Sequence, residues 1–299
     1  PLLRGITAEG PTVCILECIN RADRQSLELV DRLVSRGESG PVLFLGLATV
    51  AAATDPQTTL PWLSRKEELF SPMDRLEIAP LSAVDGRLMA GDLLAPVSPL
   101  PMRLLDLVVA EADGNPLYIE SFIRLMIEQG IISTGDRWRV DMDRAEKTPL
   151  PSDLPALIDA QLDCLSPTER RVLQCASIFG PLCWDTGLFA LIPETEIEMA
   201  EVEASLLSLV YKQFFVVDEI YSFDASQAYT FQRDSIREAV YAGIPTDERS
   251  RLHNEAANWL IATQNNTRLG AWFAVDRLIA GHFTRAGEYT RAESWRQRR

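Results

Sequence analysis

Near the start of the chain, an apolar run, an amphipathic segment and a second apolar run follow one another with short connections. Residues 12–19 are almost continuously apolar, which predicts a strand buried on both faces. Apolar residues at helical spacing predict a helix over 24–36, and residues 42–49 predict a second buried strand. A strand, a helix and a strand joined this closely imply two parallel strands with a right-handed crossover.

Two parallel strands cannot cover their own apolar faces, so we expect further strands of this sheet upstream of Pro1. The chain opens on Pro rather than Met, and it stops within a helical pattern at "SWRQRR". We therefore interpret the chain as a fragment of a longer polypeptide.

Helical patterns dominate the middle of the chain. Residues 51–100 are rich in proline and show little periodicity, apart from a short strand and turn expected at 74–82. Helices are predicted near 101–112 and over 117–129, followed by a hairpin over 131–140.

The turn between these two helices has the sequence "DGNP". Gly114 suits a left-handed helix end, Asn115 can cap the next helix, and Pro116 fits its first turn.

After a linker, a second helical block begins near residue 153. Ser166 and Glu169 form a capping box at the start of one helix. A long helix near 195–212, a two-stranded ribbon and a helix over 233–244 then predict a winged-helix outline. Everything from Arg249 onward is expected to be helical, and "LIAGHFTRAGEYTRAESW" resembles the start of a helix-turn-helix repeat array.

Composition narrows the function classes. The net charge of −14 argues against a general nucleic-acid surface, which needs clustered Lys and Arg. No apolar run has the length of about 18 residues that a membrane helix needs. The five cysteines form no C-x-x-C pair, so we expect free thiols, no sulfur-bound metal and a cytoplasmic location. His253 and His282 have no evident Ser or Cys partner, so a nucleophile triad has no support.

Four stretches, in their order and spacing, resemble the ATPase segment of large bacterial signalling proteins. These are the STAND-type relatives of the AAA+ ATPases, found in LuxR-type regulators and in adenylate cyclases and kinases with ATPase modules. The stretches are "ILECINRADRQSLELVDRL", "EADGNPLYIESFIRLMIEQGII", "LPALIDAQLDCLSPTERRVLQCASIFG" and "YTFQRDSIREAVYAGIPTDERSRLH".

The resemblance implies a mainly α chain with a partial α/β P-loop NTPase core. Residues 1–54 would be the C-terminal part of that core, and 55–148 a connector and helical lid. Residues 149–248 would form the winged-helix domain, and 249–299 the start of TPR-like helical repeats.

The resemblance also implies a metal site at the end of the first strand. Glu17 matches the family acid that helps to hold Mg²⁺, and Asp23, the last acid of the motif, is a further candidate. Cys18 stands where the family has the acid that polarises the attacking water, and a thiol is a poor substitute for a carboxylate base. Acids at strand ends also commonly cap helices, so a structural role stays open.

Four further positions match nucleotide-binding residues of the family. Thr49 matches the polar γ-phosphate sensor, although the Arg that often follows it is absent. Asn115 and Pro116 match the Gly-Asn-Pro turn beneath the nucleotide, and helix capping would explain them equally well. Arg233 stands where relatives usually carry a His, and either faces phosphate or is an exposed Arg at a helix start.

No phosphate cradle of the G-x-x-x-x-G-K-[ST] kind occurs in the 299 residues. None of the three lysines (Lys66, Lys147 and Lys212) follows a glycine. ATP and Mg²⁺ are therefore expected for the full-length protein and not for this chain alone.

Two function classes follow. The first is a fragment of an ATP-dependent signal-transduction switch, with slow or absent hydrolysis, whose C-terminal repeats bind an effector or protein partners. The full-length protein is then a candidate oligomer. The alternative is a non-catalytic protein–protein interaction scaffold with a degenerate NTPase core. DNA binding by the winged helix ranks below both, because its last helices mix acids with arginines.

Overall fold

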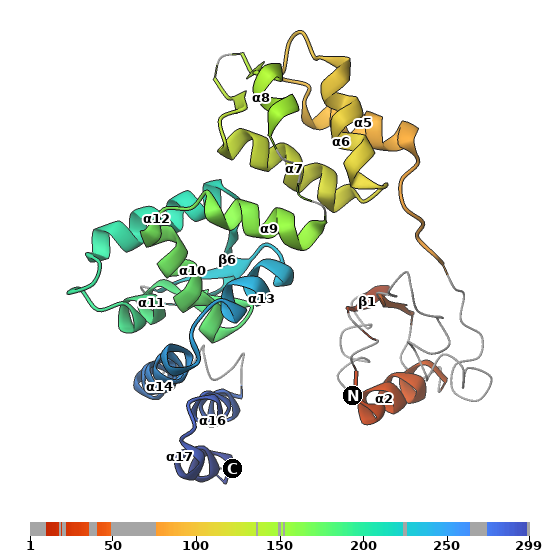
Figure 1. Cartoon of the computed structure of the whole chain (residues 1–299). Helices are drawn as coiled ribbons and strands as arrows, with labels where there is room; N and C mark the ends of the chain where they lie inside the picture. Colours follow the sequence, from red (N-terminus) through yellow and green to blue (C-terminus); the bar gives the residue numbers. More distant parts are fainter. Residues whose placement is uncertain are drawn as a thin grey trace. The chain divides into compact units, whose positions relative to one another are not determined.

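The computed structural model divides into two compact units, Pro1–Ala79 and Pro80–Arg299 (Figure 1). The described residues form thirteen helices and small sheets, which confirms the expectation of a mainly α chain. Within this described part, no helix combines the length and the apolar character that crossing a membrane requires. The structure describes residues 10–17, 19, 22–35, 41–48, 76–135, 137–148, 151, 153–223, 226–263 and 274–297.

In the first unit, a helix connects two short parallel strands. Strand β1 (Thr12–Leu16) pairs along its whole length with β2 (Val42–Gly46), and α2 (Arg24–Ser35) lies between them in sequence. The predicted strand, helix and parallel strand are therefore confirmed, but the expected burial of the second strand is not, since Leu43 and Leu45 are 55% and 42% exposed.

The prediction that β1 is buried on both faces is wrong for the described strand. Val13 and Ile15 are each 57% exposed, whereas the alternate positions Cys14 and Leu16 are half-buried. A continuous apolar run fits a strand that is covered by a layer on each face. The described sheet has two strands, and successive side chains of a strand point to opposite faces. One face of this sheet thus stays in solvent.

The second unit begins with a helical cluster. The predicted helices near 101–112 and over 117–129 are confirmed, and so is the hairpin. The cluster comprises α5 (Ala83–Leu93), α6 (Met102–Ala112), α7 (Pro116–Glu128), the antiparallel strands β3 (Ile132–Ser133) and β4 (Arg139–Val140), and α8 (Met142–Lys147).

Two details of this region differ from the sequence-based expectation. Residues 76–82 form no strand, and residues 49–75 lie outside the described part of the chain. Helix α5 was not expected, because it contains two glycines and lacks a clear apolar stripe. The start of α5 could still have been predicted from Ser82, a typical N-cap residue. Its hydroxyl accepts a hydrogen bond from the Asp85 backbone N–H at 3.2 Å.

Backbone conformation, a close contact with Leu81 and a helix cap together fix the turn between α6 and α7. Helix α6 ends at Ala112, as predicted, and the left-handed conformation expected at Gly114 (φ 73°) is shared by the preceding Asp113 (φ 44°). The Gly114 carbonyl accepts a hydrogen bond from the Leu81 N–H at 2.8 Å. A Cβ at position 114 would lie only 2.5 Å from the Leu81 carbonyl oxygen. The Asn115 side chain accepts hydrogen bonds from the backbone N–H groups of Leu117 and Tyr118, as predicted for a cap.

Next along the chain, four helices, a three-stranded antiparallel sheet and a fifth helix form one core (Figure 1). The predicted capping box of Ser166 and Glu169 is confirmed. The ribbon gains a third strand, β5, that the sequence did not reveal because it is three residues long. In chain order the elements are α9 (Leu154–Asp163), α10 (Pro167–Phe179), β5 (Leu182–Trp184), α11 (Asp185–Leu191), α12 (Met199–Tyr211), β6 (Phe215–Phe223), β7 (Ser226–Phe231) and α13 (Asp234–Ala242), with the strands in the order β5–β7–β6.

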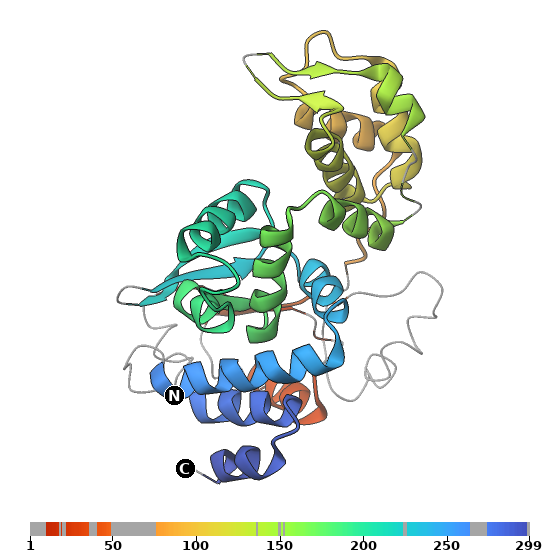
Figure 2. The same cartoon turned by 60° about the vertical axis from the view of Figure 1, so that its left-hand side comes forward.

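The C-terminal part is helical where it is described. Helix α14 (Thr246–Thr263) packs against α16 (Val275–Arg285), which packs against α17 (Tyr289–Arg296) (Figure 2). Residues 264–273 lie outside the described part.

A buried polar chain ties these helices to α13. The Tyr241 hydroxyl lies 2.9 Å from His253 Nε2, and His253 Nδ1 lies 2.9 Å from His282 Nδ1. Burial, together with the positive charge of nearby Arg285, lowers the pKa of His253 to about 4 and that of His282 to about 3. Both imidazoles are therefore neutral at pH 7, and one Nδ1–H donates to the other Nδ1.

We expect Gly114→Ala to destabilise the chain by clearly more than Gly130→Ala. Both glycines have positive φ, which costs an L-residue about 1–2 kcal/mol. Only at position 114 would the new Cβ also collide with the Leu81 carbonyl oxygen. Urea unfolding of the two variants measures the difference. Equal losses of stability would contradict the close approach of Leu81.

We also expect the free energy of unfolding to fall as the pH is lowered from 7 to 5. In this range the unfolded histidines bind protons and the folded ones do not, which costs up to about 1.4 kcal/mol per pH unit for each histidine. Urea unfolding at several pH values measures the slope. His282→Asn, which keeps a hydrogen-bonding side chain that does not titrate, should lose the contribution of one histidine, so that its stability falls clearly less over this range. An unchanged slope in this variant would show that the pair is not the cause.

Candidate functional site

The first unit holds the two acids expected near a metal. Glu17 follows β1 directly, is exposed, and makes no hydrogen bond or ion pair with described residues. The Asp23 carboxylate accepts a hydrogen bond from the Ser26 N–H at 2.8 Å, just before α2, and this bond lowers its pKa. Asp23 thus fits the structural alternative, that of a helix cap. Cys18 and Thr49 lie outside the described residues.

The described residues do not form a protein cage for a metal. Among them, no group of three His, Cys, Asp or Glu side chains lies close enough to hold an ion. Mg²⁺ at nucleotide sites usually takes one or two carboxylates and completes its shell with phosphate oxygens and water. Glu17 fits that requirement as a single available carboxylate at the carboxyl end of a parallel strand.

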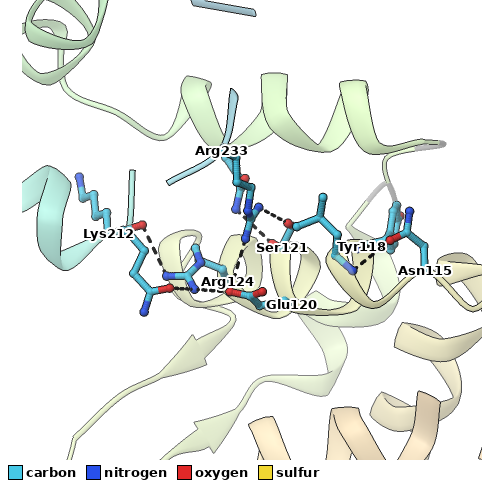
Figure 3. Close-up of polar contacts among 10 residues, drawn as sticks. Asn115, Tyr118, Glu120, Ser121, Arg124, Lys212 and Arg233 are labelled. Carbon is cyan, nitrogen blue, oxygen red and sulfur yellow. Dashed lines mark hydrogen bonds and ion pairs between the residues drawn. The ribbon is translucent and has the colours of Figure 1, made fainter. Parts of the chain in front are cut away.

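In the second unit, the Asn115 side chain is committed to the first turn of α7. Its oxygen accepts from Leu117 N–H at 3.0 Å and from Tyr118 N–H at 3.4 Å, and Pro116 occupies the first helical turn (Figure 3). The capping explanation therefore accounts fully for both predicted residues.

Arg233 lies between β7 and α13 and reaches across to α7. Its guanidinium donates a hydrogen bond to the Ser121 hydroxyl at 2.5 Å and pairs with Glu120 at 3.4 Å (Figure 3). The side chain is only 13% exposed, so the interpretation as an exposed Arg is wrong. Burial lowers its pKa, and the nearby Glu120 carboxylate opposes that shift.

A second arginine, Arg124, also connects α7 with the α9–α13 module, but it lies on α7 itself. Arg124 of α7 pairs with Glu120 one turn earlier, at 3.1 Å. It also donates to the Lys212 carbonyl at 3.5 Å and to the Gln213 side chain (Figure 3). Two guanidinium groups therefore share the single carboxylate of Glu120.

We call this set of contacts the α7 junction. It joins the polar face of α7 to the module of α9–α13, and the sequence analysis identified only Arg233 within it. Glu120 and Arg124 carried a detectable signal, because opposite charges four residues apart on a helix form a pair. The α7 junction consists of Glu120, Ser121 and Arg124 on α7 and of Gln161, Lys212, Gln213 and Arg233 facing them, with the buried Gln161 donating to the Ser121 carbonyl at 3.2 Å.

Beside the junction, Lys212 belongs to a second polar cluster. Its ammonium and the Ser208 hydroxyl each lie 2.6 Å from the same oxygen of Glu169. These three side chains, with Cys164 and Ser205, line an open cavity of about 560 Å³. The hydrogen bonds from Lys212 and Ser208 keep the pKa of Glu169 below its ordinary value, although its burial acts in the opposite direction.

Comparison with known proteins gives no further identification: no family model matches the chain, and neither does any curated protein. Of the predicted site residues in the second unit, Arg233 contacts the same helix that Asn115 caps.

We expect Arg233→Ala to lower the free energy of unfolding by about 1–3 kcal/mol, because it leaves the buried Ser121 hydroxyl without its donor and removes one of the two partners of Glu120. Arg237→Ala is the matched control, since Arg237 lies four residues further along, in α13, and pairs with Asp234 of the same helix. Thermal and urea unfolding compare the variants. Equal losses of stability in the two variants would mean that the contacts of Arg233 with α7 stabilise the chain no more than the local ion pair of Arg237 does.

Proposed function

We propose that this chain is part of an ATP-dependent signal-transduction switch of the STAND class, in which nucleotide occupancy rather than rapid turnover carries the signal. The observation that carries the proposal is Arg233. The residue at the expected phosphate-facing position is buried and bonded to α7, the helix that begins with the Gly-Asn-Pro turn.

The element order supports the same proposal for the rest of the chain. Residues 1–54 would be the end of a P-loop NTPase core, with Glu17 after a parallel strand. Residues 55–148 would be the helical lid, and 149–248 a winged helix built on the β5–β7–β6 sheet. Helices α14, α16 and α17 would begin a TPR-like array that binds an effector or a partner protein, in a protein we place in the cytoplasm.

Each residue then has a definite task. Glu17 would hold Mg²⁺, and ATP with this ion would supply the negative charge that distinguishes the two states of the switch. Arg233 presents a planar pair of donors suited to a phosphate, and Ser121 and Glu120 orient that guanidinium. Cys18 is a weak base at neutral pH, so hydrolysis would be slow or absent.

The alternative is a scaffold for protein partners with a degenerate NTPase core. It is favoured by the fact that the side chains of Asp23, Asn115 and Arg233 already have protein partners. In that case the α7 junction holds two modules together and needs no nucleotide.

Binding of a fluorescent ATP analogue with Mg²⁺ distinguishes the two. We expect the polypeptide encoded by the complete natural reading frame to bind it, and the 299-residue chain not to. Arg233→Ala in the complete polypeptide should weaken binding by tenfold or more, since a hydrogen bond to a charged group contributes about 1.5–3 kcal/mol. Arg237→Ala should leave binding unchanged.

Thermal unfolding of the complete polypeptide with and without Mg²⁺ and ATP provides the second measurement. If neither binding nor a Mg²⁺-dependent rise in the unfolding temperature is found, the switch proposal fails and the scaffold takes its place.

A further inference from the structure

Glu128, the last residue of α7, has a carboxylate without a hydrogen-bond partner. Both of its oxygens are buried, and neither is bonded to any described residue. A buried acceptor left without a donor costs about 1–3 kcal/mol, and more when it is charged. Burial without a donor therefore disfavours the ionised form of this carboxyl group relative to the neutral acid.

Charged groups from every side face Glu128, but their bonds go elsewhere. Arg124 lies one helical turn earlier, and its terminal nitrogens bond to Glu120, Gln213 and the Lys212 carbonyl, whereas its buried Nε has no partner among the described residues. The Lys212 ammonium bonds to Glu169. The groups that interact electrostatically with Glu128 are Arg124 on α7, Lys212 after α12, Glu169 on α10 and Cys164 at the end of α9.

The balance of these influences keeps a proton on Glu128 into the neutral range. Burial raises its pKa from 4.5 to about 7, Arg124 and Lys212 act against that shift, and Glu169 adds to it. The group thus changes charge at a pH where ordinary glutamates are fully ionised.

We propose that Glu128 makes the α7 junction pH-responsive around neutrality: the junction is closed while Glu128 is protonated and loosens when Glu128 ionises. The junction is suited to this because polar bonds from Arg124, Arg233 and Gln161 hold it. An ionised Glu128 competes with Glu120 for Arg124 and with Glu169 for Lys212. This inference does not depend on nucleotide binding.

The direction and size of the effect follow from proton linkage. A pKa raised in the closed state stabilises that state at low pH, and the stabilisation is lost as the pH rises through about 7. With a pKa of about 7 when closed and 4.5 when open, the opening equilibrium constant rises about tenfold between pH 6 and pH 8.

Amide hydrogen exchange of the whole chain, corrected for the intrinsic effect of pH, measures this opening. We expect peptides from the second half of α7 and from residues 208–215 to open about tenfold more at pH 8 than at pH 6 in the wild type. Glu128→Gln, which keeps the shape but cannot ionise, should stay closed at both values. Glu146→Gln, an exposed change in the same unit, should behave as the wild type does.

A ¹³C carboxyl titration of the wild type keeps the test independent of any variant. One glutamate should titrate with a midpoint near 7. The proposal is overturned if no glutamate titrates in this range, if the wild type opens equally at pH 6 and pH 8, or if Glu128→Gln retains the tenfold change.

Discussion

Helix α7 is the element on which the arrangement of the second unit depends, because it has a partner on each of two faces. Its apolar face, which includes Ile119, Phe122 and Met126, is buried in the core formed with α5 and α6. Its polar face carries Glu120 and Arg124 to the neighbouring module. A shift of one residue at the start of the helix would rotate both faces by about 100°. The cap by Asn115 and the close packing of Gly114 on Leu81 therefore determine which residues reach the junction.

The junction is specific because most of its buried polar groups have a definite partner across it. Arg124 and Arg233 share Glu120, Lys212 pairs with Glu169, and Ser121 uses both its hydroxyl and its carbonyl. Buried pairs of this kind contribute little net stability, since desolvation offsets much of the attraction. They penalise any alternative docking that would leave a charge unpaired. Among the described residues, Glu128 and the Nε of Arg124 are buried without partners, and because Glu128 is the one of the two that titrates near neutrality, the response to pH is expected there.

The sequence predicted elements well where local signals determine the structure, and less well where distant residues do. Caps and turns such as Asn115 and the Ser166–Glu169 box depend on residues within four positions, and they were identified correctly. Helix α5 and strand β5 have weak local patterns and are stabilised by packing, so they were missed. The burial of Arg233 depends on Ser121, 112 positions away, and no periodicity reveals such a pairing. The exposure of one face of β1 could not be predicted from local patterns either, because it depends on what packs against the strand.

The pairing of Arg233 also shows how one structure can serve either proposed function. A phosphate that binds the Arg233 guanidinium has to displace one of its two partners, Glu120 or Ser121. Glu120 is the one to leave, because its contact at 3.4 Å is longer than the hydrogen bond to Ser121 at 2.5 Å. Glu120 would not be left unpaired, because Arg124 holds the same oxygen at 3.1 Å. The exchange therefore costs one weak ion pair and leaves the bond to Ser121 intact. Without a nucleotide, the same two arginines simply keep α7 bound to the α9–α13 module, so the step from a scaffold to a switch requires no new residue in the α7 junction.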